Sequence, residues 1–119
     1  MPHFANKEMK ESAQAESDRL KALPIEDLSI EVMSAFGPDG IRIDSGHLRG
    51  AVQIAEWLLR DHLVKTKYTQ PVLGPTIEAL GALEAAGLIN SRTFGKGNAK
   101  TYRSTRLGEK ALAEGTVAV

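Results

Sequence analysis

Apolar positions along the first third of the chain form two helical patterns of unequal strength. Between Asn6 and Leu23 the apolar residues are sparse and lie near a 4-3 spacing. This spacing is typical either of a helical arm that pairs with a second subunit or of a frayed tail. After Pro24 the spacing becomes regular, so we expect a helix over 25–36 with Pro24 or Ile25 in its first turn. Its apolar stripe consists of Ile25, Leu28, Val32 and Phe36.

The next segments predict a short strand and then a long helix. Residues 37–40, Gly-Pro-Asp-Gly, turn the chain, and residues 41–43 alternate apolar and polar side chains as a strand does. Ser45 is a suitable N-cap for a helix that extends to Leu63, with Trp57 to one side of a broad apolar face. That face comprises Leu48, Ala51, Val52, Ala55, Leu58, Leu59 and either His62 or Leu63.

Residues 64–74 show no clean periodicity, and the next helix is expected to begin at Pro75. A proline inside an established helix would clash with the carbonyl four residues earlier, whereas the first helical position accepts it. Residues 68–73 then form either a short helical turn or an unusual connection. Gly87 is expected to end the helix as its C′ residue, with Leu88 making the accompanying apolar contact. The core stripe of this helix consists of Ile77, Leu80 and Leu83.

From Leu88 onward the apolar spacing changes to two residues. Segments 88–94 and 99–104 are typical of the strands of a hairpin, with the glycine-rich segment 95–98 as its tip. Thr105 should cap a last helix over 106–114. Its inward residues are expected to be Leu107, Ala111 and Leu112.

The whole pattern predicts a mainly α fold with a small β-hairpin. Residues 1–23 form an arm or tail, residues 24–115 a single domain, and residues 116–119 a loose C-terminus.

Two motifs near the hairpin resemble a known class of regulator. Residues 76–89, Thr-Ile-Glu-Ala-Leu-Gly-Ala-Leu-Glu-Ala-Ala-Gly-Leu-Ile, resemble the recognition-helix exit of winged-helix regulators such as the MarR, PadR and ArsR families. Tyr102 and residues 105–108, Thr-Arg-Leu-Gly, are similar to the residues that close the basic wing in those families. The resemblance covers residues 73–113. It implies a winged helix-turn-helix fold that binds duplex DNA.

Basic and polar side chains near this helix and on the hairpin are therefore the candidate contacts. Lysine and arginine neutralise phosphates and release counterions, and short polar side chains near a helix N-terminus grip phosphate oxygens. Asn98 is equally well explained as a turn residue, and residues 65–70 as an ordinary solvated loop. The candidate DNA-binding residues are Lys65, Lys67, Tyr68, Thr69, Gln70, Thr76, Glu78, Arg92, Lys96, Asn98, Lys100 and Arg103.

The expected outward face of this helix has little chemistry for reading bases. With Leu80 at the centre of the buried stripe, Thr76 falls at the edge. The outward residues are then Glu78, Ala79, Ala82 and Ala85. Lys, Arg, Asn and Gln, which usually read base edges, do not occur between Pro75 and Gly87. This favours either modest base specificity or a small face that packs on protein.

Charge changes this picture only through its distribution. The formal net charge is +0, which taken alone argues against nucleic acid. Residues 1–59 carry 6 Lys/Arg and 10 Asp/Glu, and residues 60–110 carry 9 Lys/Arg and 4 Asp/Glu. The acidic first part and basic second part can present one cationic face.

Composition and spacing argue against several other classes. The chain has no cysteine and no apolar run as long as a membrane span, so we expect a cytoplasmic protein without membrane association. His3, His47 and His62 are scattered, which predicts no metal site. No nucleophile elbow, phosphate loop or dinucleotide fingerprint is present, so we expect neither a cofactor nor enzymatic activity.

The sequence thus predicts a transcriptional regulator that binds double-stranded DNA as a homodimer. The first helix, the N-terminal arm and the last helix are the expected dimer elements. The alternative is a winged helix that binds protein within a larger complex. The DNA-binding interpretation requires that the basic side chains of the hairpin form one surface beside a helix terminus.

Overall fold

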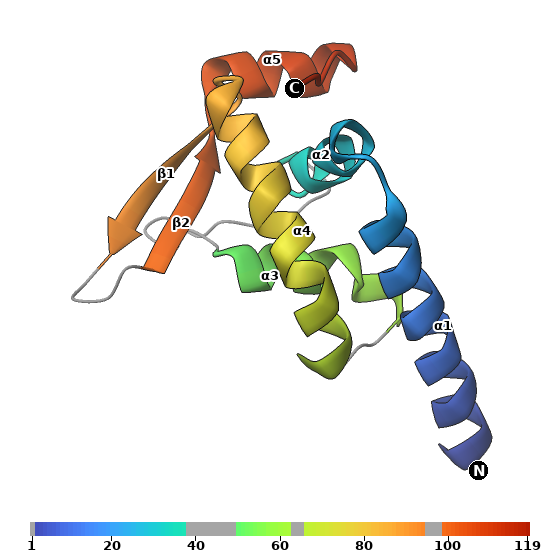
Figure 1. The fold of residues 1–119 in the computed structure, drawn as a ribbon. Helices are drawn as coiled ribbons and strands as arrows, with labels where there is room; N and C mark the ends of the chain where they lie inside the picture. The colour runs from blue at the N-terminus through green and yellow to red at the C-terminus, as the bar shows by residue number, and fades with distance from the viewer. Residues whose placement is uncertain (1, 38–49, 63–65, 95–98) are drawn as a thin grey trace.

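The computed structural model describes residues 2–37, 50–62, 66–94 and 99–119 (Figure 1). This part of the chain forms five α-helices, one short 3-10 helix and one antiparallel hairpin. The expectation of a mainly α fold with a small hairpin is confirmed. In chain order the elements are α1 (Pro2–Ala22), α2 (Ile25–Ser34), α3 (Ala51–Leu58), η1 (Arg60–His62), α4 (Thr66–Ala85), β1 (Ile89–Phe94), β2 (Ala99–Ser104) and α5 (Arg106–Glu114).

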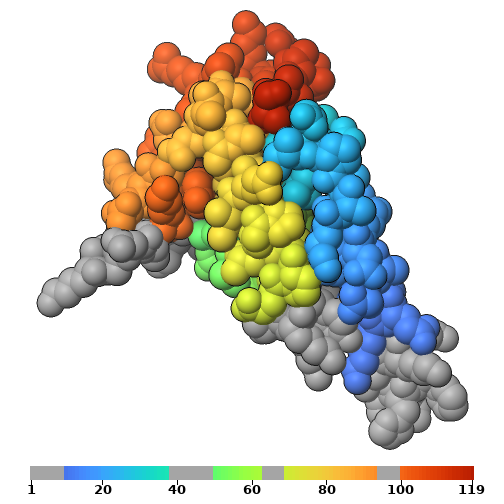
Figure 2. Space-filling view, in the orientation of Figure 1, coloured from blue at the N-terminus to red at the C-terminus, as the bar shows by residue number. Residues whose placement is uncertain are grey.

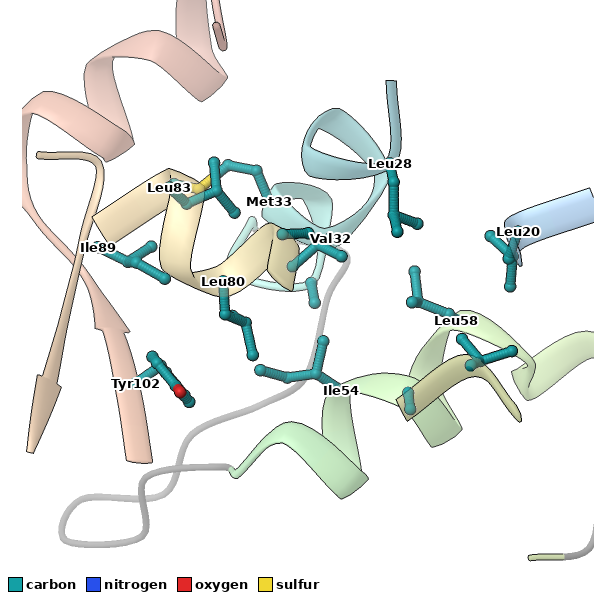
Figure 3. Close-up of a cluster of buried hydrophobic side chains, with 14 of the residues drawn as sticks. Leu20, Leu28, Val32, Met33, Ile54, Leu58, Leu80, Leu83, Ile89 and Tyr102 are labelled. Atoms are coloured by element: carbon teal, nitrogen blue, oxygen red, sulfur yellow. The ribbon is translucent and has the colours of Figure 1, made fainter. Parts of the chain in front are cut away.

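Helix α4 is the central element, with α1 on one side, the hairpin on the other, and α2 and α3 packed against it (Figure 1). Figure 3 shows Leu80 of α4 directed toward Ile54 of α3, with Ile89 and Tyr102 of the hairpin beside it. Leu80, Ile54 and Ile89 are at most 1% exposed. Burying such side chains stabilises a fold by roughly 1.5–3 kcal/mol each, so this cluster joins the hairpin to the helices.

Helix α4 begins at Thr66, so the expected start at Pro75 is wrong. Pro71 and Pro75 both lie inside the helix, and each removes one backbone hydrogen bond. Burial explains why the helix nevertheless continues. Thr69, Val72 and Thr76 are at most 3% exposed and extend the stripe of Leu80 and Leu83 toward the N-terminus.

Helix α3 is shorter than the helix expected over 45–63. It begins at Ala51 because Gly50 is extended, with φ −84° and ψ 177°, and its N–H donates to Gln53 Oε1 at 2.8 Å. The chain leaves the α-helix after Leu58 and forms η1. Ser45, Leu48 and the expected strand at 41–43 lie outside the described residues.

Three apolar residues that were expected to face inward are instead exposed. Val52 is 44%, Ile77 49% and Leu107 56% exposed. In contrast, Ala79, expected on the outward face of α4, is completely buried. Helix α4 is therefore rotated relative to the expected orientation, so that Ile77 replaces Ala79 at the surface.

Helix α1 packs against its own chain through Ala13, Ser17 and Leu20, and its N-terminal end extends away from the rest of the molecule (Figure 1). The helical interpretation of the first segment is confirmed, whereas its pairing with a second subunit stays a prediction. Arg19 ties α1 to α2, because its guanidinium donates to Glu31 Oε1 at 2.8 Å and to Glu16 Oε2 at 2.9 Å.

Candidate nucleic-acid interface

The junction between α4, β1 and α5 sets the direction of the hairpin. Gly87 has φ +80°, a conformation that side chains other than glycine rarely adopt. Its N–H donates to the Glu84 carbonyl, and the N–H of Leu88 reaches back to the Leu83 carbonyl, both at 3.0 Å. This pair of bonds is a Schellman motif, with Leu83 and Leu88 both buried. The expected end of the helix at Gly87 is confirmed.

Thr105 closes the same junction from the other end of the hairpin. Its hydroxyl donates to the Gly87 carbonyl at 2.7 Å and accepts from the Gly108 N–H at 3.0 Å, so it also caps α5 as expected. Its backbone N–H donates to the Leu88 carbonyl at 3.0 Å. The space for this contact depends on Gly108, since an added Cβ would lie 2.0 Å from the Leu88 carbonyl oxygen.

The two strands present two chemically different faces. Asn90 pairs with Arg103 and Arg92 pairs with Thr101, so these four side chains share one face, here called the outer face. Arg92, Arg103 and Asn90 are exposed. Ile89 and Tyr102 occupy the opposite, inner face and are buried against the helices.

The outer face forms a shallow cationic hollow of about 370 Å³. Its lining residues are Asn90, Ser91, Arg92 and Arg103. Arg92 and Arg103 are diagonal neighbours across the strands, a spacing that long side chains can bridge. Within the described residues, neither arginine forms a salt bridge, and no carboxylate lines the hollow. Two guanidinium groups are therefore available to one anion.

Glu84, in the last turn of α4, connects this helix to the hairpin by hydrogen bonds. Its carboxylate accepts from the Ser91 N–H at 3.2 Å and from the Ser91 hydroxyl at 2.5 Å. Burial, together with the nearby negative charge of Glu84, raises the pKa of Tyr102 above its ordinary value. Tyr102 therefore remains a neutral phenol at physiological pH.

Lys100 does not belong to the outer face. It pairs with Thr93 on the inner side of the hairpin and lines a second hollow of about 480 Å³ together with Val52, Ile77 and Tyr102. We call this second cavity the inner hollow. The expectation that the basic side chains of the hairpin form one surface is wrong, because the alternation of a strand sends Lys100 and Arg103 to opposite faces. Lys96 and Asn98 lie outside the described residues.

The residues expected to bind DNA near the start of α4 are divided by burial. Gln70 and Glu78 are exposed. Thr69 is only 3% exposed and Thr76 is completely buried, with its hydroxyl donating to the Val72 carbonyl at 2.8 Å. Thr69 and Thr76 are therefore corrected from DNA contacts to core residues.

The basic residues expected before this helix now belong partly to α4. Lys67 and Tyr68 lie in its first turn, and Lys65 lies outside the described residues.

The outward face of α4 remains poor in chemistry for base recognition. Over residues 69–85, the part of α4 whose side chains the structure describes, only Gln70 and Glu78 are exposed side chains of types that read base edges. The exposed residues of that range are Gln70, Pro71, Gly74, Ile77, Glu78, Gly81 and Ala85. Asn90, which sequence reasoning missed, supplies a side-chain amide beside the two arginines. The register of the hairpin was the signal for it, since Asn90 lies opposite Arg103.

The remaining polar groups do not form another recognisable site. In the described ranges, no group of three or more His, Cys, Asp or Glu side chains is arranged to hold a metal ion. His62 Nδ1 lies 2.6 Å from the Ser12 hydroxyl, but Glu16 is 3.9 Å from Nε2, too far for the hydrogen bond that orients a catalytic histidine. Across the same ranges, no helix combines the length and apolar character needed to cross a membrane.

Comparisons of the chain with protein-family models, curated proteins and solved structures give no match. Any functional assignment therefore depends on the geometry of the molecule itself.

Proposed function

We propose that this protein binds double-stranded DNA through the outer face of its hairpin and acts as a transcriptional regulator with a winged-helix fold. The observation that carries the proposal is the placement of Arg92, Arg103 and Asn90 on one exposed face, around a hollow whose described lining includes no carboxylate. A planar guanidinium donates two parallel hydrogen bonds to phosphate oxygens, and two such groups can hold adjacent positions of one strand.

In this proposal, the outer face of the hairpin and the exposed side of α4 make different contributions to DNA binding. The outer face supplies backbone affinity through its arginines, and Asn90 supplies the amide that adenine recognition uses in the major groove. Gln70 is exposed in the N-terminal half of α4, where it adds a second polar contact. Because the other exposed residues of α4 over 69–85, apart from Glu78, are small or apolar, we expect affinity to exceed base specificity.

The test is a salt series of binding to a short DNA duplex, measured by fluorescence anisotropy. The slope of log K against log salt is negative, and each lost phosphate contact reduces its magnitude by about 0.9, so Arg92→Ala with Arg103→Ala should reduce the magnitude by about 2. Lys100→Ala is the matched control, because it removes a charge from the same hairpin on the opposite face. An unchanged slope in the double variant would overturn the proposal.

Protein binding is the second candidate, favoured by the exposed Ile77 and Val52 beside the inner hollow. If this were the main function, the chain would pass through a heparin column at low salt. Retention that falls steeply with salt instead supports DNA binding.

A further inference from the structure

The described lining of the inner hollow is mainly apolar and includes one cation, Lys100. Val52 of α3 and Ile77 of α4 stand on its walls, 44% and 49% exposed. Tyr102 also lines it, and Lys100 is the only charged residue of its described lining. Figure 2 shows part of the surface of α3 between α4 and the hairpin.

The outward face of α2 has the complementary chemistry. Ile30 is 49% exposed at the middle of this helix. Glu26 and Asp27 precede Ile30 by four and three residues, so their carboxylates lie on the same side of the helix one turn away. Both are exposed, and within the described part of the chain neither forms a salt bridge. Glu31, in contrast, is already paired with Arg19.

We propose that a second copy of this chain docks the outward face of its α2 into the inner hollow. Ile30 of one copy would pack between Val52 and Ile77 of the next, and Glu26 or Asp27 would pair with Lys100. A helix laid into an apolar groove is a common mode of recognition, and here each charged group at the edge meets the opposite sign. The alternatives, an unrelated protein or nucleic acid in the hollow, predict no association of the pure chain.

The contact is head-to-tail, because the two surfaces are different patches of the same molecule. Such contacts form rings or open chains and do not by themselves close a two-fold dimer. The proposal therefore differs from a symmetric homodimer through α1 or α5. It does not depend on DNA binding, because Arg92 and Arg103 lie on the other face of the hairpin.

Sedimentation velocity over a concentration series of the pure full-length chain tests the proposal. The wild-type average mass should rise with concentration and pass twice the monomer mass. Ile30→Asp and Ile77→Asp should each remain monomeric. An equimolar mixture of these two variants should form a complex of two chains and nothing larger, because each variant retains the surface that the other has lost.

Matched variants distinguish this contact from nonspecific association and from misfolding. Leu107→Asp removes an apolar side chain of similar exposure on α5 and should associate as the wild type does. Circular dichroism melts should show the same stability for all variants, since the substituted side chains are exposed. The double variant Arg92→Ala with Arg103→Ala should also associate normally.

Two results would overturn the proposal. A wild-type chain that stays monomeric at all concentrations removes the contact altogether. A mixture of Ile30→Asp and Ile77→Asp that stays monomeric, although the wild type associates, removes α2 as the occupant.

A charge reversal tests the ion pair of the contact. Lys100→Glu should weaken association about tenfold. Mixing this variant with a second chain that carries Glu26→Lys and Asp27→Lys should restore association.

Discussion

The two ends of α4 are held in place by different means. At the C-terminal end, Gly87, Thr105 and Gly108 form a set of backbone contacts that leaves little room for change. The N-terminal half contains Pro71 and Pro75, and no atom of the described residues lies within 4 Å of a Cβ built on Gly74. The first end is fixed by close geometry, whereas the second depends on the burial of one stripe of side chains.

This difference separates the two surfaces with a proposed function. The hairpin leaves the tightly packed end of α4, so the junction sets the direction of its outer face, whereas the pairing of the two strands sets the spacing of Arg92 and Arg103. The inner hollow is bounded by Leu73 and Ile77, next to the glycine and proline residues of the other half. We therefore expect substitutions at the junction to change both stability and DNA binding, and substitutions on the exposed face of α4 to change stability little.

Gly108→Ala should have the largest effect on stability. Its new methyl group would lie 2.0 Å from the Leu88 carbonyl oxygen and 2.7 Å from the terminal methyl of Met33. Met33 can move, but the backbone carbonyl is held by the Thr105 N–H. We expect a loss of about 3 kcal/mol or more in the free energy of unfolding, measured by urea denaturation. A loss below about 1 kcal/mol would show that α5 can withdraw from the junction without cost.

Thr105→Val should have an intermediate effect at the same junction. Valine keeps the shape of the side chain and the β-branched backbone preference, but removes the bonds to the Gly87 carbonyl and the Gly108 N–H. We expect a loss of about 1–2 kcal/mol in urea denaturation, because one helix cap and one further hydrogen bond disappear. Thr105→Ser retains the hydroxyl and should stay within about 0.5 kcal/mol of the wild type. A loss in Thr105→Ser as large as that in Thr105→Val would contradict this assignment, because it would mean that the methyl group contributes as much as the hydroxyl.

The junction was predictable from sequence, whereas the first half of α4 was not. Gly87 and Thr105 act through their own backbone conformation and local hydrogen bonds, so their residue types are enough to predict the local structure. Thr69 and Thr76 have polar side chains but are buried. Because they were counted as polar positions, the sequence pattern did not reveal the buried stripe that stabilises the helix across Pro71 and Pro75. Burial against α1, α2 and α3 overrides the local cost of proline, and no local signal contains that information.

The candidate site was predictable only in part for a similar reason. The arginines of the hairpin were found because basic residues follow a helix end and alternate with polar ones. Their division between faces depends on which residues pair across the strands, and that register is set by the length of the turn as well as by the pattern. Arg103 and Asn90 meet on the outer face because they are directly opposite, while Lys100 falls on the inner face with Thr93.

Gly81→Ala should have the smallest effect, and of opposite sign. Gly81 is exposed in the middle of α4, and an added Cβ would have no neighbour within 4 Å in the part of the chain that the structure describes. Alanine restricts the unfolded chain and favours the helix, so the free energy of unfolding should rise by about 0.5–1 kcal/mol. The same substitution at Gly87, six residues later, should instead lower it by about 1–2 kcal/mol, because φ there is +80° and a Cβ is strained in that conformation. Opposite signs at the two glycines, measured in the same urea titration, would distinguish a helix body that tolerates any small residue from a helix end that requires glycine. A loss of stability at both positions would mean that α4 does not run as a regular helix through Gly81.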